Sequence, residues 1–353
     1  MKDYGFYFYF FSKMYDRIII GDNMKKERLI NIDLFKIVCI IAVIIIHVSS
    51  YNIFNTEYFD LVWKNFSIIN FYNMVARFCV PGFIMVSGMF LLEKKPTIKD
   101  IFRKYIFRIA VLYCIFSFLY SVIACYESNV DILSFFFKGD YHLWYLYLIV
   151  GLYLVTPFLV KIIEDKNITV YFLILALLFS SIIPLVQRII NIDGIKAAFS
   201  LLNVYMPVGY VGYYVAGYFF SKNKVNKILY YILGLLGLIS NIIIFRYASY
   251  YNDIYNSVFL LPGTVFQSIA CFLFFKDLNI KRTLVPIIGF ISKHILGIYL
   301  THMFIIKIIF YYFPTIIYKY SIISIPLVSV IVFIISFLVC IVLRKLPVFK
   351  HFL

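Results

Sequence analysis

Long apolar segments recur along the chain and are separated by short polar loops. A helix that crosses a membrane needs about 20 consecutive, mostly apolar residues. Ten segments meet this requirement: residues 29–50, 67–92, 104–125, 142–160, 168–187, 203–220, 228–245, 256–275, 294–312 and 321–343. The pattern therefore predicts an all-α fold, a polytopic integral membrane protein with about ten transmembrane helices.

The composition agrees with this prediction. The chain is 63% hydrophobic and 14% charged, whereas a soluble domain is about 45–50% apolar and about 25% charged. The six cysteines are scattered singly inside apolar runs, without a Cys-x-x-Cys pair. This spacing favours membrane packing over a disulfide framework or a zinc site, so no metal is expected.

The positions of Lys and Arg predict the orientation. Most of the 33 basic residues fall in alternate loops and at both ends of the chain, and cytoplasmic loops are enriched in Lys and Arg. Both termini are therefore expected in the cytoplasm of a multi-pass protein surrounded by membrane lipids. The net charge of +16 is explained by topology, so it gives no support to a nucleic-acid partner. The opposite loops hold few basic residues, namely Lys64, Lys138, Arg188, Lys196, Arg246 and Lys319.

Residues 1–23 do not resemble a signal peptide, because charges interrupt their aromatic run and no small residues follow it. Met24 then begins a short basic stretch before the first predicted helix. We interpret residues 1–23 as an N-terminal extension that lies upstream of the true start at Met24. The alternative is an amphipathic arm at the membrane surface. Residues 24–353 are expected to form one transmembrane domain, since every loop is short.

The first helix carries three ionisable residues, Asp33, Lys36 and His47. Eleven residues separate Lys36 from His47, which gives a net rotation of about 20° and an axial distance of about 16 Å. The three side chains therefore lie along one stripe. Ionisable groups inside a membrane usually face the bundle interior and are functional candidates. The alternatives are an interhelical hydrogen bond for His47, snorkelling for Lys36, and a helix-dipole contact with an ion pair to Lys36 for Asp33.

Further polar residues lie at membrane depth in later helices. Arg77 is expected near the midplane, where snorkelling is difficult, so it should have an anionic partner or ligand. His142 and His302 are candidates as well, but an interfacial position or an interhelical hydrogen bond would also explain them. Lys307 lies nearer the outer end of its helix, and we expect it to snorkel.

An ordered set of motifs resembles the membrane acyltransferase-3 family. The motifs are Asp33-Leu34-Phe35-Lys36 followed by ten residues and His47; Arg77-Phe78-Cys79-Val80-Pro81-Gly82-Phe83 through Ser87-Gly88; His142-Leu143-Trp144-Tyr145-Leu146; Gly212-Tyr213-Tyr214 through Gly217-Tyr218; and Gly297-Ile298-Tyr299-Leu300-Thr301-His302. The match runs from about Arg28 to the last helix. This short form without a hydrolase-like domain is similar to the enterobacterial common antigen O-acetyltransferase type.

The resemblance implies transfer of an acyl group, most often acetyl, from cytoplasmic acetyl-CoA or another acyl-CoA to a hydroxyl group. The acceptor would be an envelope polysaccharide or a lipid-linked glycan at a bacterial cytoplasmic membrane. It also implies catalytic roles for His47 and Arg77. CoA would bind near Lys36, Asp33, Arg103 and Lys104, and the acceptor near His142, Trp144, Tyr299 and His302. The family's Arg-x10-His pair falls on Lys36 and His47, so this chain has Lys in place of Arg.

Two other functions are compatible with the same polar path. A transporter or flippase for a glycan precursor would use buried cations without thioester chemistry, although no internal repeat supports that interpretation. A non-catalytic partner of a polysaccharide synthase is the third possibility. The residues do not distinguish acetyl from longer acyl groups, direct transfer from an acyl-histidine route, or one oligomeric state from another.

Overall fold

The chain forms a bundle of helices in the computed structural model, which describes residues 29–51, 59–128, 131–190, 208–247 and 258–353. Every regular element in these ranges is a helix, as the sequence predicts. Residues 1–23 and Met24 lie outside the described residues, so the proposed start stays a prediction.

Each of the ten predicted spans corresponds to a helix or a pair of helices. They are α2 (Ile30–Ser50), α3 and α4 (Phe59–Ala76 and Cys79–Lys94), α6 (Phe107–Ser128), α8 (Trp144–Ile162), α9 and α10 (Lys166–Leu177 and Ile183–Ile190), α12 (Val208–Lys222), α13 (Lys227–Tyr247), α15 (Pro262–Lys276), α17 (Ile295–Tyr312) and α19 (Ser321–Leu343). Within the described ranges, eight helical segments are long and apolar enough to cross a membrane. Helices α12 and α15 are shorter, with 15 residues each.

Shorter helices connect these spans. They are α5 (Ile98–Asp100), a π-helical turn (Ile101–Ile106), α7 (Ile132–Lys138), a 3-10 turn (Tyr141–Leu143), a second π-helical turn (Leu178–Ile182), two further 3-10 turns (Val258–Leu260 and Arg282–Leu284), α16 (Val285–Ser292), α18 (Ile316–Lys319) and α20 (Pro347–Phe352). The predicted span 67–92 is interrupted at Arg77 and Phe78, where α3 ends and α4 begins. Pro81 thus lies in the first turn of α4, where the missing N–H of proline is tolerated.

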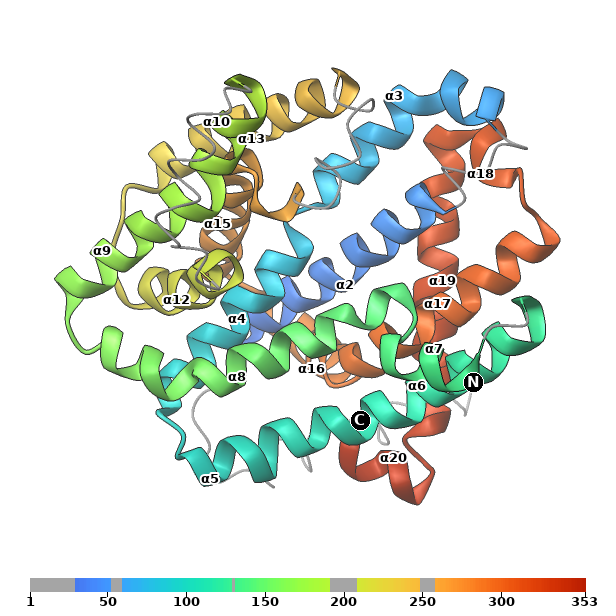
Figure 1. Ribbon diagram of the computed structural model, residues 1–353, viewed down its shortest axis with the longest axis horizontal. Coiled ribbons are helices and arrows are strands. Elements are labelled where there is room, and N and C mark those ends of the chain that lie inside the picture. Colours follow the sequence, from blue (N-terminus) through green and yellow to red (C-terminus); the bar gives the residue numbers. More distant parts are fainter. Residues whose placement is uncertain (1–28, 52–58, 129–130, 191–207, 248–257) are drawn as a thin grey trace, which may run out of the picture.

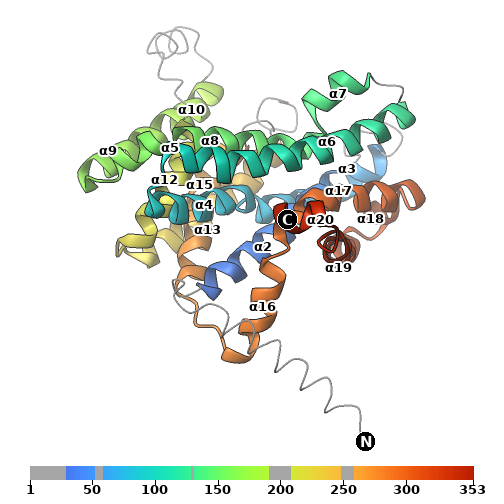
Figure 2. The same ribbon diagram turned by 90° about the horizontal axis from the view of Figure 1, so that it is seen from below.

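Helix α2 lies near the centre of the bundle, between α4 on one side and α17 and α19 on the other (Figure 1). It also packs against α3, α15 and α16. A second view shows α6 and α8 stacked over α4, with α16 extending away from them (Figure 2). The stripe that carries Lys36 and His47 is therefore surrounded by protein.

Three ion pairs join loops that the charge pattern assigns to one side of the membrane. The loops around residues 93–104, 161–167, 221–227 and 276–283 therefore lie together, and we call this the basic end of the bundle. The pairs are Lys95–Glu164 (3.9 Å), Lys222–Glu93 (2.9 Å) and Lys227–Asp277 (2.6 Å).

Helices α4 and α12 approach closely at two glycines. A Cβ atom built on Gly88 would lie 1.9 Å from the carbonyl oxygen of Tyr214, and one on Gly217 would lie 1.9 Å from that of Met85. Small residues allow membrane helices to pack backbone against backbone. This contact holds α4 beside α12 and so fixes the start of α4 next to α2.

We expect Gly217→Ala to destabilise the bundle, because its methyl group meets backbone that cannot rotate away. The cost should reach about 3 kcal/mol or more, the upper end for overpacking. Gly151→Ala is the matched control, because nothing lies within 4 Å of its Cβ position, and a helical Gly→Ala change is worth up to about 1 kcal/mol of stabilisation. The stability of both variants is measured by thermal aggregation of the detergent-solubilised protein. Equal stability of Gly217→Ala and Gly151→Ala would contradict the close contact between α4 and α12.

Candidate functional site

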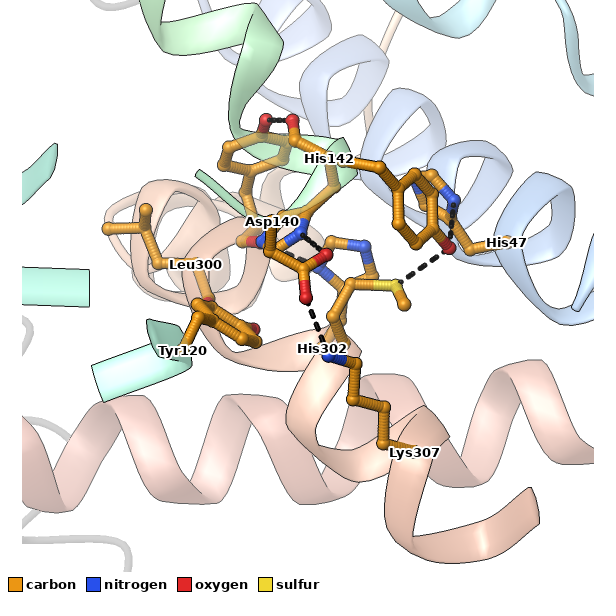
Figure 3. Close-up of polar contacts among 10 residues, drawn as sticks. His47, Tyr120, Asp140, His142, Leu300, His302 and Lys307 are labelled. Carbon is orange, nitrogen blue, oxygen red and sulfur yellow. Dashed lines mark hydrogen bonds and ion pairs between the residues drawn. The ribbon is translucent and has the colours of Figure 1, made fainter. Parts of the chain in front are cut away.

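Three histidines from three helical elements meet inside the bundle (Figure 3). His47 comes from the last turn of α2, His142 from the turn before α8, and His302 from the middle of α17. The ring centroid of His302 lies 5.2 Å from that of His47 and 5.3 Å from that of His142. We call these three residues the histidine cluster.

The turn between α7 and α8 positions two members of the site. Gly139 ends α7 with a φ angle of +70°, a conformation that glycine adopts readily. The next three residues then alternate in direction. Asp140 and His142 are buried, at 3% and 1% exposure, whereas Tyr141 is 55% exposed.

A chain of charged and polar contacts fixes His142. The Nζ atom of Lys307 lies 2.6 Å from Oδ2 of Asp140, and Oδ1 of the same carboxylate lies 3.1 Å from Nδ1 of His142. Lys307 also lies over the ring of Tyr120, 5.3 Å from its centroid. The prediction that Lys307 snorkels to the interface is therefore wrong. Its ammonium group turns inward because a buried carboxylate needs a partner.

Tyrosines enclose the other sides of the cluster. The hydroxyl group of Tyr299 donates to the backbone carbonyl of His142, and that of Tyr120 donates to the carbonyl of Leu300 at 3.0 Å. The ring of Tyr120 stacks on Phe304 with a centroid distance of 3.8 Å. These contacts bind α6, α8 and α17 together around the imidazoles.

The hydrogen bonds define the protonated nitrogen of His142 and His302. Nδ1 of His302 lies 2.6 Å from the carbonyl oxygen of Tyr299, which can only accept, so Nδ1 carries the proton. Nδ1 of His142 donates to the carboxylate of Asp140 for the same reason. The hydroxyl group of Tyr141 lies 3.4 Å from Sδ of Met303 and 3.2 Å from Nδ1 of His47. Since a hydroxyl has one proton, Tyr141 can donate to only one of these two atoms, and the tautomer of His47 decides which.

The rings of His142 and His302 therefore keep a lone pair on Nε2. The Nε2 atoms of His142 and His302 are buried and have no hydrogen-bond partner among the described residues. A buried acceptor without a donor costs about 1–3 kcal/mol. Nitrogens with free lone pairs in a water-excluded site can act as bases or nucleophiles. The two alternatives from the sequence were an interfacial position for His142 and an interhelical hydrogen bond for His302. In the structure His142 is buried, and His302 bonds to a carbonyl of its own helix.

A cavity of about 650 Å³ runs beside α2, from the basic end toward the histidine cluster. Its size falls within the usual range of about 300–1,000 Å³ for ligand pockets. Lys36 lines it near the start of α2, Val43 lines it one turn before His47, and Tyr299 lines it one turn before His302. We call it the α2 cavity.

Four cationic side chains line the α2 cavity: Lys36, Lys104, Arg108 and Lys293. Lys36 pairs with Asp33 at 2.5 Å and keeps 27% side-chain exposure. The predicted helix-dipole position of Asp33 is thus combined with an ion pair. The four cations make the entrance of the cavity suited to an anionic ligand.

The sequence-predicted CoA residues divide into two groups. Lys36 and Lys104 line the α2 cavity, and Asp33 reaches it through Lys36. Arg103 is exposed and is not among the lining residues. Arg108 and Lys293 were missed, although both are basic residues near the predicted cytoplasmic ends of helices, which is a signal that could have found them.

Arg77 and Trp144 form a neighbouring group. Arg77 is buried at the junction of α3 and α4, and its guanidinium lies 5.0 Å from the ring centroid of Phe259. Trp144 contacts the same phenyl ring at 6.1 Å and Tyr210 at 5.8 Å. Arg77 is close enough to His47 for an electrostatic interaction. His142, Tyr299 and His302, which the resemblance assigns to the acceptor, lie together beside His47, although Tyr299 also lines the α2 cavity. Trp144 lies beside Arg77 instead.

No group of three or more His, Cys, Asp or Glu side chains in the described parts of the chain could hold a metal ion. The histidine cluster lies about one helical turn beyond a cavity that is lined by four cations. This arrangement is suited to the transfer of a group from an anionic donor.

Comparison with known proteins supports this chemistry. No curated protein and no solved structure matches the chain. The family model of acyltransferase-3, described as an acyltransferase domain, matches residues 29–345. This range contains α2 through α19 and every residue of the histidine cluster. The chain belongs to the acyltransferase-3 family and is a multi-pass membrane acyltransferase.

Proposed function

We propose that this protein is an O-acyltransferase of the bacterial cytoplasmic membrane. It would move an acyl group, most simply acetyl, from cytoplasmic acyl-CoA to a hydroxyl group of an envelope polysaccharide or glycolipid, as in the enterobacterial common antigen type of the family. The observation that carries the proposal is the course of the α2 cavity. The cavity begins among cations at the basic end and approaches the histidine cluster within about one helical turn.

The cationic entrance supports an acyl-CoA donor. CoA carries phosphates at one end and its thioester at the other, so its charged part and its reactive carbon must lie far apart. Lys36 lies about 16 Å along α2 from His47, at 1.5 Å per residue. In this arrangement Lys36, Lys104, Arg108 and Lys293 hold the phosphates, and the pantetheine arm follows the cavity between them and Tyr299.

His47 is the proposed general base. In the proposed tautomer Nδ1–H of His47 donates to Tyr141, 3.2 Å away, and Nε2 takes the proton of the acceptor hydroxyl as that oxygen attacks the acyl carbon. Tyr141 is exposed at the end of α2 away from the basic loops. The acceptor would therefore reach His47 from the outer side, opposite to the donor.

Arg77 is proposed to stabilise the oxyanion. It does not line the α2 cavity, so a role in binding the pyrophosphate of CoA is not supported. Its electrostatic interaction with His47 instead places its charge near the reacting groups. A fixed charge in a water-poor site stabilises developing negative charge strongly.

The proposed function is tested by the base-labile O-acyl content of isolated envelope glycans. The strains are the parent, a deletion, and the deletion carrying wild-type protein or His47→Ala at matched expression. We expect the deletion and His47→Ala to lack one specific ester that wild type restores, because loss of a general base costs about 100-fold or more. Unchanged esters with accumulation of a glycan precursor inside the cell would instead support transport.

The donor site predicts different outcomes for neighbouring basic residues. Arg108→Ala should raise the KM for acyl-CoA about tenfold, because a charge-assisted hydrogen bond is worth about 1.5–3 kcal/mol. Lys36→Arg should be tolerated or lower that KM, since a guanidinium binds phosphate in a bidentate manner. Arg103→Ala, outside the α2 cavity, is the control and should change KM little. If Arg103→Ala raised the KM for acyl-CoA and Arg108→Ala did not, the assignment of the α2 cavity as the donor site would be wrong.

Tyr141 predicts a separate effect on kcat. Tyr141→Phe removes the acceptor for Nδ1–H of His47 while keeping the ring beside the imidazole. We expect kcat to fall about tenfold, the equivalent of one ordinary hydrogen bond of about 1.4 kcal/mol, with little change in the KM for acyl-CoA. Steady-state kinetics on purified protein measures both constants. An unchanged kcat would show that Tyr141 does not orient His47.

A further inference from the structure

His302 is the least explained residue of the site. His47 is sufficient as a base for a single direct transfer, yet His302 is fully buried between His47 and His142. Its Nε2 atom has no partner among the described residues, and its proton is fixed on Nδ1. Both features prepare the ring for a reaction at Nε2.

The position of His302 along α17 relates it to the donor. Tyr299 lines the α2 cavity, and His302 follows it three residues later, about 4.5 Å further along the helix axis. His302 has no exposed surface, whereas His47 is partly exposed and contacts the exposed Tyr141. A thioester that arrives through the α2 cavity therefore approaches a fully buried imidazole, and an acceptor from the other side approaches His47.

We propose that His302 is an acyl carrier and that the reaction has two steps, with His302 as the nucleophile and His47 as the base. This inference rests on the proposed function and adds a covalent intermediate to it.

In the first step, the lone pair on Nε2 of His302 attacks the thioester carbonyl. A C–N bond forms, the C–S bond breaks, and CoA leaves as a thiolate that takes a proton from water on the cytoplasmic side. The ring, which keeps its Nδ1 proton, becomes an acyl-imidazolium. Asp140 accepts a hydrogen bond from His142, whose ring centroid lies 5.3 Å from that of His302, and its negative charge would favour this positive charge.

In the second step, the acceptor hydroxyl attacks the acyl carbon. An ester C–O bond forms, the C–N bond breaks, and the hydroxyl proton moves to Nε2 of His47. His302 returns to its neutral form, and His47 releases its proton to water on the outer side. The burial of His302 excludes water, which would otherwise hydrolyse an acyl-imidazole.

The two-step route is tested by exchange of radiolabelled CoA into unlabelled acetyl-CoA on purified full-length protein, without acceptor. A carrier enzyme catalyses this exchange, because its first step is reversible and needs no acceptor. Wild type should exchange. His47→Ala should retain exchange yet lose more than about 100-fold of transfer to glycan extracted from the parent envelope. His302→Ala and His302→Gln should lose both reactions.

His294→Ala is the matched control, because His294 is also buried and its Nδ1 also contacts a carbonyl, that of Phe290 at 2.8 Å. It should keep both reactions. Acid-quenched wild type should carry the acetyl group on the peptide that contains His302. If wild type transfers the acyl group but does not exchange CoA, His302 is not an acyl carrier. The same conclusion follows if His302→Gln retains CoA exchange while His47→Ala loses it. The absence of any transfer by wild type would reject the proposed function itself.

Discussion

The ion pair between Lys307 and Asp140 is the contact on which the arrangement of the site depends. Asp140 is 3% exposed and Lys307 is 21% exposed, and removing the partner of a buried charge costs about 3–5 kcal/mol because that charge stays buried. The pair joins α17 to the turn before α8. The second oxygen of Asp140 then fixes His142, and the neighbouring turn of α17 presents His302. One buried carboxylate thus sets the position of two imidazoles, while the third comes from α2 at the centre of the bundle.

The path of the substrates follows from the packing of α2. A single helix carries Lys36 at the basic end and His47 near the opposite end, and the α2 cavity follows that helix from Lys36 to Val43. The close contact of Gly88 and Gly217 keeps α4 beside α12, so that the wall of the cavity formed by α4 is in place. A membrane acyltransferase with a charged donor needs such a division, because phosphates must stay near water while the thioester reaches a site without it.

The sequence predicts three features correctly: the helical spans, the stripe of Lys36 and His47, and the grouping of the basic loops. Each of them depends on local periodicity or on charge along the chain. The break between α3 and α4 could not be predicted, since the apolar pattern continues through Arg77 and Phe78. The partners Asp140 and Lys307 are 167 positions apart. Such a pair depends on tertiary packing, so Lys307 by itself predicts only a snorkelling side chain. Arg108 and Lys293 likewise join the donor residues only through the fold.

The tautomers of the histidine cluster carry one last consequence. Two rings use their Nδ1 proton on a fixed acceptor, a carboxylate for His142 and a backbone carbonyl for His302. Both rings therefore have a lone pair on Nε2, and neither can donate to the other while both are neutral. Such a group of acceptors has no favourable resting arrangement of its own, because no donor among the described residues serves Nε2 of His142 or His302. The arrangement becomes favourable when an acyl group or a proton is bound to one ring. The positive charge of that ring is then stabilised by the neighbouring lone pairs and by the carboxylate of Asp140. This arrangement would favour the charged intermediate proposed above over the resting state, as catalysis by differential stabilisation requires.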